Sequence, residues 1–153
     1  MTALAPFLRQ PTIRYVLETS FALRDMKFAR WTFLIAGVYG LLALVPMYFM
    51  ETQFGIDNPP AITHPEFFYG FIGVAVAFQL VFIIISTDPL KYRPLMLAAI
   101  VEKFSFAIAA AVLLMQGRLA GMIIIGAAID ALLGALFTVA WFRTGMANRS
   151  GQN

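Results

Sequence analysis

The chain lacks cysteine altogether and has a single histidine among its 153 residues. Without cysteine, a disulfide framework, thiolate chemistry and cysteine-ligated metal centres are all excluded. The single histidine excludes a haem held by two histidines within a helical bundle. His64 with its neighbour Glu66 supplies too few ligands for a zinc site. We therefore predict neither a cofactor nor a metal ion for this protein.

Charge is the second scarce property of this sequence. Charged residues make up 12% of the chain, whereas hydrophobic residues make up 61%. Soluble domains carry about twice this charged fraction, so a water-soluble fold of this length cannot bury so much apolar surface. Lipid must therefore solvate the exterior, and the bilayer is the first partner that the sequence predicts.

Four long apolar runs dominate the chain, and each approaches the ~20 residues that a helix needs to cross the hydrocarbon layer. We expect an all-α fold, namely an integral membrane antiparallel four-helix bundle at 31–143, preceded by a segment at 1–30 and followed by a tail at 144–153. The four spans are predicted at about 31–50, 67–86, 94–116 and 119–142.

Basic residues predict how this bundle sits in the membrane. The connections at 51–66 and 116–118 hold one basic residue, Arg118, and Lys103 lies within a span. The pattern follows the positive-inside rule, so we predict a multi-pass protein of the bacterial cytoplasmic (inner) membrane with both termini cytoplasmic. No nucleic-acid motif accompanies the charges, so nucleic acid is not predicted as a partner. The remaining nine basic residues precede span one, separate spans two and three, or follow span four: Arg9, Arg14, Arg24, Lys27, Arg30, Lys91, Arg93, Arg143 and Arg149.

We expect the segments outside the spans to differ in how regular their structure is. Thr12 is a candidate N-cap for a weakly amphipathic helix that runs to about Phe28. This segment either lies at the membrane interface, with its basic side chains among the headgroups, or forms a partly ordered tail. The connection at 51–66 is acidic and rich in proline, which predicts an irregular loop. The connection at 116–118 is so short that spans three and four must be antiparallel neighbours.

Small residues are predicted to hold the spans together, because burial from lipid alone does not drive helices to associate. In span four, Gly126, Asp130 and Gly134 share one face. This face packs either against the other spans of the bundle or against a second copy of the chain in a homo-oligomer. Span three is rich in alanine between Ala98 and Ala111. Similar stripes lie in span one (Ala36, Gly37, Gly40 and Ala43) and in span two (Gly70, Gly73 and Ala77).

Three ionisable residues lie within the spans, where such groups are costly and often mark function. They are Glu102 and Lys103 in span three and Asp130 in span four, with Gln79 and Tyr39 as uncharged polar neighbours at a similar depth. Because side chains lean toward the N-terminus of their helix, Lys103 and Asp130 lean apart. A long lysine side chain can still span this gap, so a pair with Asp130 stays open, whereas the adjacent Glu102 and Lys103 do not face each other. Of these two residues, we expect Lys103 to be the one that reaches the inner headgroups.

Three interpretations of this polar cluster remain open. It fixes the bundle's register, it binds a ligand or ion, or its carboxylates act as general acid and base on a lipophilic substrate. The leading hypothesis is a non-enzymatic membrane protein that binds a small hydrophobic or cationic ligand or serves as a subunit of a membrane assembly. The alternative is a membrane-embedded enzyme that uses Glu102 and Asp130.

Two stretches near the C-terminal half, DPLKYRPLMLAAIVEKFSF at 88–106 and IDALLGALFTVAWFRT at 129–144, support a comparison with a known group. With the four-span layout, they resemble small uncharacterised bacterial inner-membrane proteins that are DoxX-like in size and hydropathy. The resemblance covers about the last two spans, and it implies the fold without assigning a role to any residue.

Overall fold

The computed structural model describes residues 11–119 and 121–150, and within them the chain is all-helical, with no strand. This confirms the predicted fold class. The helices are α1 (Pro11–Leu44), the 3₁₀ helix η2 (Val45–Phe49), α2 (Glu51–Asp57), α3 (Pro65–Thr87), α4 (Arg93–Met115) and α5 (Met122–Ser150).

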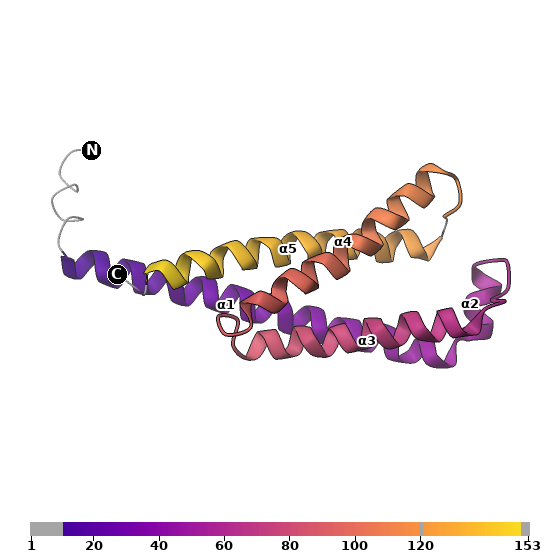
Figure 1. Cartoon of the computed structure of the whole chain (residues 1–153), viewed down its shortest axis with the longest axis horizontal. Coiled ribbons are helices and arrows are strands. Elements are labelled where there is room, and N and C mark those ends of the chain that lie inside the picture. Colours follow the sequence, from indigo (N-terminus) through magenta and orange to yellow (C-terminus); the bar gives the residue numbers. More distant parts are fainter. Residues whose placement is uncertain (1–10, 120, 151–153) are drawn as a thin grey trace.

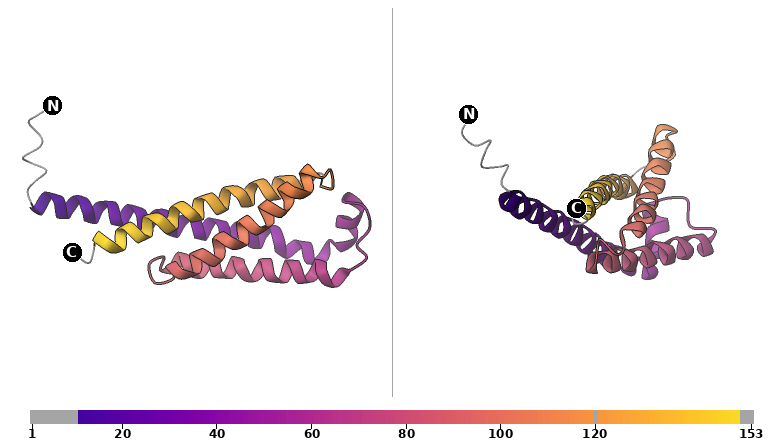
Figure 2. Two further views of the ribbon diagram at one scale, coloured as in Figure 1. Left: turned by 45° about the horizontal axis from the view of Figure 1, so that its top comes forward. Right: turned by 60° about the vertical axis from the view of Figure 1, so that its left-hand side comes forward.

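The long helices form two antiparallel pairs, α1 with α3 and α4 with α5 (Figure 1). A tight turn at 88–92 joins α3 to α4, and from this turn the two helices diverge toward the opposite end, as both views in Figure 2 show. We call the end that carries this turn the turn end, and the opposite end the α2 end. Both α1 and α5 extend past the turn end.

Four helices are long and apolar enough to cross a membrane. With 23 residues each, α3 and α4 measure about 34 Å, slightly more than the thickness of the hydrocarbon core. Many large apolar side chains point outward from all four, for example Leu42, Val101 and Leu132. Water does not solvate such a surface, which agrees with the prediction of an integral membrane bundle.

The first span continues without a break from the residues that precede it. Helix α1 begins at Pro11 and passes through Trp31 as one helix. It ends at Leu44, because Pro46 interrupts the α-helical hydrogen-bond pattern and the backbone tightens into η2. An interfacial position for the segment at 1–30 stays a prediction, and residues 1–10 lie outside the described part of the chain.

The expectation of an irregular loop at 51–66 is wrong for its first half, which forms α2. Seven residues do not make a stable helix by themselves, so tertiary contacts must hold this one. The ring of Phe54 lies 5.4 Å from that of Phe68 on α3. The Tyr69 hydroxyl donates a hydrogen bond of 2.8 Å to Glu51. These contacts fix α2 over the end of the bundle.

The tightly packed core lies toward the turn end. Phe33 of α1 stacks on Phe137 of α5 with ring centroids 4.2 Å apart, and Phe82 of α3 meets Phe137 edge-on at 4.9 Å. All three side chains are fully buried. Aromatic pairs in these geometries add about 0.5–1.5 kcal/mol each beyond their area burial. Three helices thus share one aromatic contact, around which the smaller core residues pack: Ala29, Ala36, Ile85, Met96, Ala99 and Ala140.

Arginines satisfy backbone groups at the turn end. Arg30 donates to the carbonyls of Ser86 and Thr87, at the C-terminus of α3, where carbonyls lack helical partners. Arg93 donates to the Trp141 carbonyl and lies over its indole ring. At the same turn, Asp88 accepts a hydrogen bond from the Lys91 amide, which closes the turn.

Small residues bring α1 and α3 into close contact, as predicted for α1. Gly37 and Gly40 are buried against α3, where Gln79 covers Gly40. The predicted stripe on α3 is wrong at two positions, because Gly70 and Ala77 are exposed. On α3, the surface that receives α1 is built from larger side chains that pack over the glycines of α1.

We predict that Gly37→Ala destabilises the bundle. An added Cβ would lie 2.9 Å from the backbone oxygen of Gln79 and 2.7 Å from Ile83 Cγ1. Such overpacking costs about 1–3 kcal/mol, whereas alanine's better helix propensity returns about 1 kcal/mol at most. Thermal unfolding in mild detergent measures the effect. Gly70→Ala is the matched control, because no atom lies within 4 Å of its added Cβ. Equal melting temperatures for both variants would contradict the close approach of α1 and α3.

Candidate functional site

A cavity of about 800 Å³ lies between the helices in the half of the bundle nearer the α2 end. All of the long helices, η2 and α2 contribute to its lining. The lining residues nearest the turn end are Ala36, Gln79, Glu102 and Leu133, and the aromatic core begins one turn beyond them. The cavity's lining residues on α3 and α4 lie away from the turn, in the part of the bundle where these two helices diverge (Figure 1).

Its walls are mostly apolar. Phe71 of α3 and Phe106 of α4 face each other, with ring centroids 5.9 Å apart. Several of the lining residues are exposed. They include Val74 on α3, which is 62% exposed, and Met122 at the start of α5, which is 77% exposed. The cavity is therefore not sealed within the bundle.

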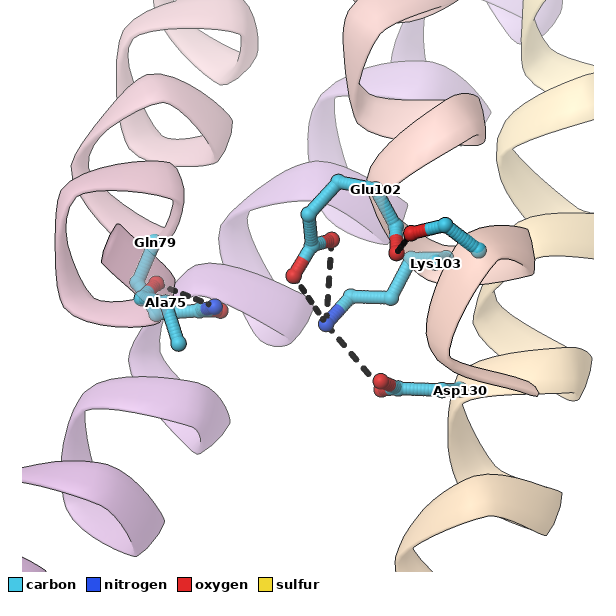
Figure 3. Close-up of polar contacts among 6 residues, drawn as sticks. Ala75, Gln79, Glu102, Lys103 and Asp130 are labelled. Carbon is cyan, nitrogen blue, oxygen red and sulfur yellow. Dashed lines mark hydrogen bonds and ion pairs between the residues drawn. The ribbon is translucent and has the colours of Figure 1, made fainter. Parts of the chain in front are cut away.

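The charged cluster, which we define as Glu102, Lys103 and Asp130, forms the floor of this cavity (Figure 3). The Lys103 ammonium lies 3.3 Å from both carboxylate oxygens of Glu102 and 3.0 Å from Oδ1 of Asp130. It also lies over the Phe82 ring of the core, 5.3 Å from the centroid. Lys103 is only 5% exposed, so its charge is held at the boundary between core and cavity.

The expectation that Lys103 reaches the headgroups is wrong, and the pair with Asp130, which the sequence left open, is present. The long lysine side chain bridges the difference in depth. The neighbouring Glu102 also turns toward the ammonium, although the two residues project about 100° apart around the helix. Two carboxylates stabilise the ammonium locally, so it gains little by moving to the membrane surface.

The cluster is not balanced in charge or in hydrogen bonds. Two carboxylates share one ammonium, which leaves a formal charge of −1. Glu102 Oε2 is buried and accepts no hydrogen bond from the described part of the chain. Asp130 has Lys103 as its ion-pair partner, while about one-fifth of its side chain stays exposed. A further positive charge in the cavity can therefore meet the cluster at Asp130, whereas Glu102 Oε2 has no exposed surface.

The two uncharged residues predicted with this cluster also line the cavity. The Gln79 amide is turned back to the Ala75 carbonyl of its own helix, 2.9 Å away, so it makes no hydrogen bond to the charged cluster (Figure 3). Tyr39 is half-exposed on α1. All five predicted residues thus face one space, whereas their use as a ligand site stays a prediction.

The face at Gly126, Asp130 and Gly134 is directed mainly into this chain. An added Cβ at Gly134 would lie 3.1 Å from the Phe104 ring of α4, so Gly134 serves the contact between α4 and α5. Asp130 pairs with α4 through Lys103. Gly126 lines the cavity and meets no atom within 4 Å. A homo-oligomer through this face stays a prediction.

Several cavity residues were not expected from the sequence. Asp57 and Asn58 line the cavity because α2 folds over the bundle, and nothing in a proline-rich connection signals that position. Phe71 and Phe106 read as ordinary lipid-facing aromatics. Helical periodicity does not distinguish a side chain that faces lipid from one that faces an interhelical cavity, since both are apolar.

The chain matches no protein-family model, no curated protein and no solved structure. The DoxX-like resemblance of its last two spans therefore stays a prediction.

We predict that Lys103→Met lowers stability through the loss of the shared counter-charge. Removing one partner of a buried ion pair costs roughly 3–5 kcal/mol, and we expect the lower end because both carboxylates are partly exposed. Adding Asp130→Asn to this variant removes the repulsion and should restore much of the loss. Thermal unfolding in detergent is the measurement, with Lys91→Met at the exposed turn as the control. A Lys103→Met protein as stable as the control would show that the cluster contributes nothing to the fold.

Proposed function

We propose that this protein is a multi-pass membrane protein that binds a small lipophilic ligand in the cavity, with the polar part of the ligand at the charged cluster. The observation that carries this proposal is the combination of an apolar cavity with a charged floor. Ligand sites typically enclose 300–1,000 Å³ and combine apolar walls with a few polar groups that fix orientation. A cavity of about 800 Å³ lies within this range.

The position of the cavity also supports a ligand that arrives from the membrane. Phe71 and Val74 line the cavity and are partly exposed, and they belong to α3, which is one of the helices long and apolar enough to cross a membrane. A lipophilic molecule in the bilayer could therefore reach the cavity without crossing water. The rim formed by α2, with Asp57 and Asn58, supplies further polar groups to the lining.

Binding fits this geometry better than catalysis. A general acid or base needs a carboxyl group that is free to exchange a proton with a substrate. Here Lys103 engages both Glu102 and Asp130. A role as a subunit of a membrane assembly remains the competing proposal, and in that case a protein rather than a lipophile would co-purify.

The first test fills the cavity without touching the charged cluster. In Gly126→Phe the new ring enters open space in the cavity, whereas in Gly70→Phe it enters open space outside the cavity. We expect the Gly126→Phe protein to retain at least about tenfold less of the co-purifying lipophile than the native protein does, because the new ring occupies the site. Mass spectrometry of organic extracts from protein in mild detergent measures the retained lipophile.

Gly70→Phe is the matched control and should retain the lipophile at the native level. Thermal unfolding of both variants checks that the fold is intact. Equal retention in the two variants, or no lipophile in the native protein, would contradict the proposal. Specific retention of another protein instead would favour the assembly.

We also propose that the turn end faces the cytoplasm, as in a bacterial inner membrane. Support comes from the basic residues Arg30 and Arg93, which gather at this end, while Glu51, Asp57 and Glu66 lie at the α2 end. The positive-inside rule places the basic end in the cytoplasm.

The absence of cysteine makes this orientation directly testable. We expect Thr63→Cys, in the exposed connection beside α2, to react with a membrane-impermeant maleimide in intact bacterial cells. Leu90→Cys, in the exposed turn, should react only after permeabilisation. The reverse order of labelling would show that the orientation is inverted.

A further inference from the structure

We propose that the ligand of this cavity is a lipophilic organic monocation, which the excess negative charge of the cluster selects. The inference rests on the proposed function and goes beyond it by naming the charge of the ligand. It follows from the charged groups that face the cavity and from the chemistry of its walls.

Acidic residues outnumber basic residues in the lining of the cavity. Among the described residues that line the cavity, Lys103 is the only cationic one, and it faces two carboxylates, Glu102 and Asp130. The other acidic lining residue, Asp57, lies at the rim on α2. In a low-dielectric space between helices, one uncompensated negative charge attracts a cation far more strongly than it would in water.

The hydrogen-bond pattern agrees with this count. Lys103 pairs with Oδ1 of Asp130 and lies 3.3 Å from each carboxylate oxygen of Glu102, while about one-fifth of the Asp130 side chain stays exposed. The cluster already holds one ammonium, that of Lys103, and can share its two carboxylates with a second. A ligand cation seated next to Asp130 therefore completes an alternating arrangement of two positive and two negative groups.

The walls favour an organic cation over a metal ion. Metal ions such as Ca²⁺ need six or more oxygen ligands, and no group of three or more His, Cys, Asp or Glu residues in the described part of the chain could hold one. The cavity instead offers aromatic rings, including Phe54, Phe71 and Phe106, and aromatic faces attract organic cations. An apolar body and a single positive charge match these walls and this floor.

Two nearly isosteric probes of opposite charge test the inference. Tetraphenylphosphonium is a lipophilic cation and tetraphenylborate is its anionic counterpart. Binding of each to the purified protein in nanodiscs of neutral lipid is measured by equilibrium dialysis, with empty nanodiscs subtracted. We expect the native protein to bind the cation at least about tenfold more tightly than the anion, as one charge-assisted interaction allows.

Variants that change only the charge sharpen the test. We expect Asp130→Asn to lower the affinity for tetraphenylphosphonium about tenfold, while Asp57→Asn, which removes the same charge at the exposed rim, has a smaller effect. Glu102→Gln combined with Asp130→Asn leaves Lys103 as the only charge of the cluster, so the preference should reverse toward tetraphenylborate. The comparison of the two probes on the native protein needs no variant to fold.

The outcomes separate this inference from the proposed function. Equal affinity for the two probes, or preference for the anion, overturns the inference about charge, and if Gly126→Phe abolishes that binding the cavity remains a lipophile site. If neither probe binds while a native lipophile is still lost in Gly126→Phe, the ligand is not a cation of this kind. If neither probe binds and Gly126→Phe retains everything, both proposals fail.

Discussion

The ammonium of Lys103, held between two carboxylates, is the interaction on which the organisation of this bundle depends. It joins α4 to α5 through Asp130, between two of the helices that are long and apolar enough to cross a membrane, where an isolated charge is costly. It also lies directly over the aromatic ring of Phe82, which belongs to the packed core. On one side of this ammonium the helices are packed tightly, and on the other they separate.

The two ends of the bundle therefore differ in how closely their helices pack. At the turn end, Phe33, Phe82 and Phe137 bring three helices together, and arginines satisfy the carbonyls around the turn. At the α2 end, α3 and α4 diverge (Figure 2), and residues of all four long helices line the cavity. The packed core lies directly beneath the charged floor of the cavity, where the Lys103 ammonium contacts the Phe82 ring.

Much of the fold follows from the sequence because the bilayer restricts the possible structures. An apolar run of about 20 residues must satisfy its backbone internally, so four such runs with short connections predict a helical bundle. Glycines on the first span predicted the contact of α1 with its neighbour correctly. Helix α2 was missed because its stability comes from Phe54 and Glu51 contacting α3 rather than from local propensity.

The site was harder to predict than the fold. Its polar residues stand out from the sequence, since charges are rare within spans, but their pairing depends on how far a flexible side chain reaches. Backbone direction suggested that Lys103 and Asp130 lean apart, yet four methylene groups are enough to join them. The cavity itself has no sequence signature, because it lies where α3 and α4 diverge and is lined by residues that also suit a lipid-facing surface.

The measurement that tests this account most directly is the reactivity of single cysteines along α5 toward a small, water-soluble methanethiosulfonate reagent in nanodiscs. A thiol reacts only where water and reagent reach it. The account predicts rapid modification of Gly126→Cys, which lines the cavity, and none of Leu132→Cys, which faces lipid, or of Ala140→Cys, which is buried in the core. An unreactive Gly126→Cys, or equal reactivity at the three positions, would contradict a cavity that ends at the charged cluster.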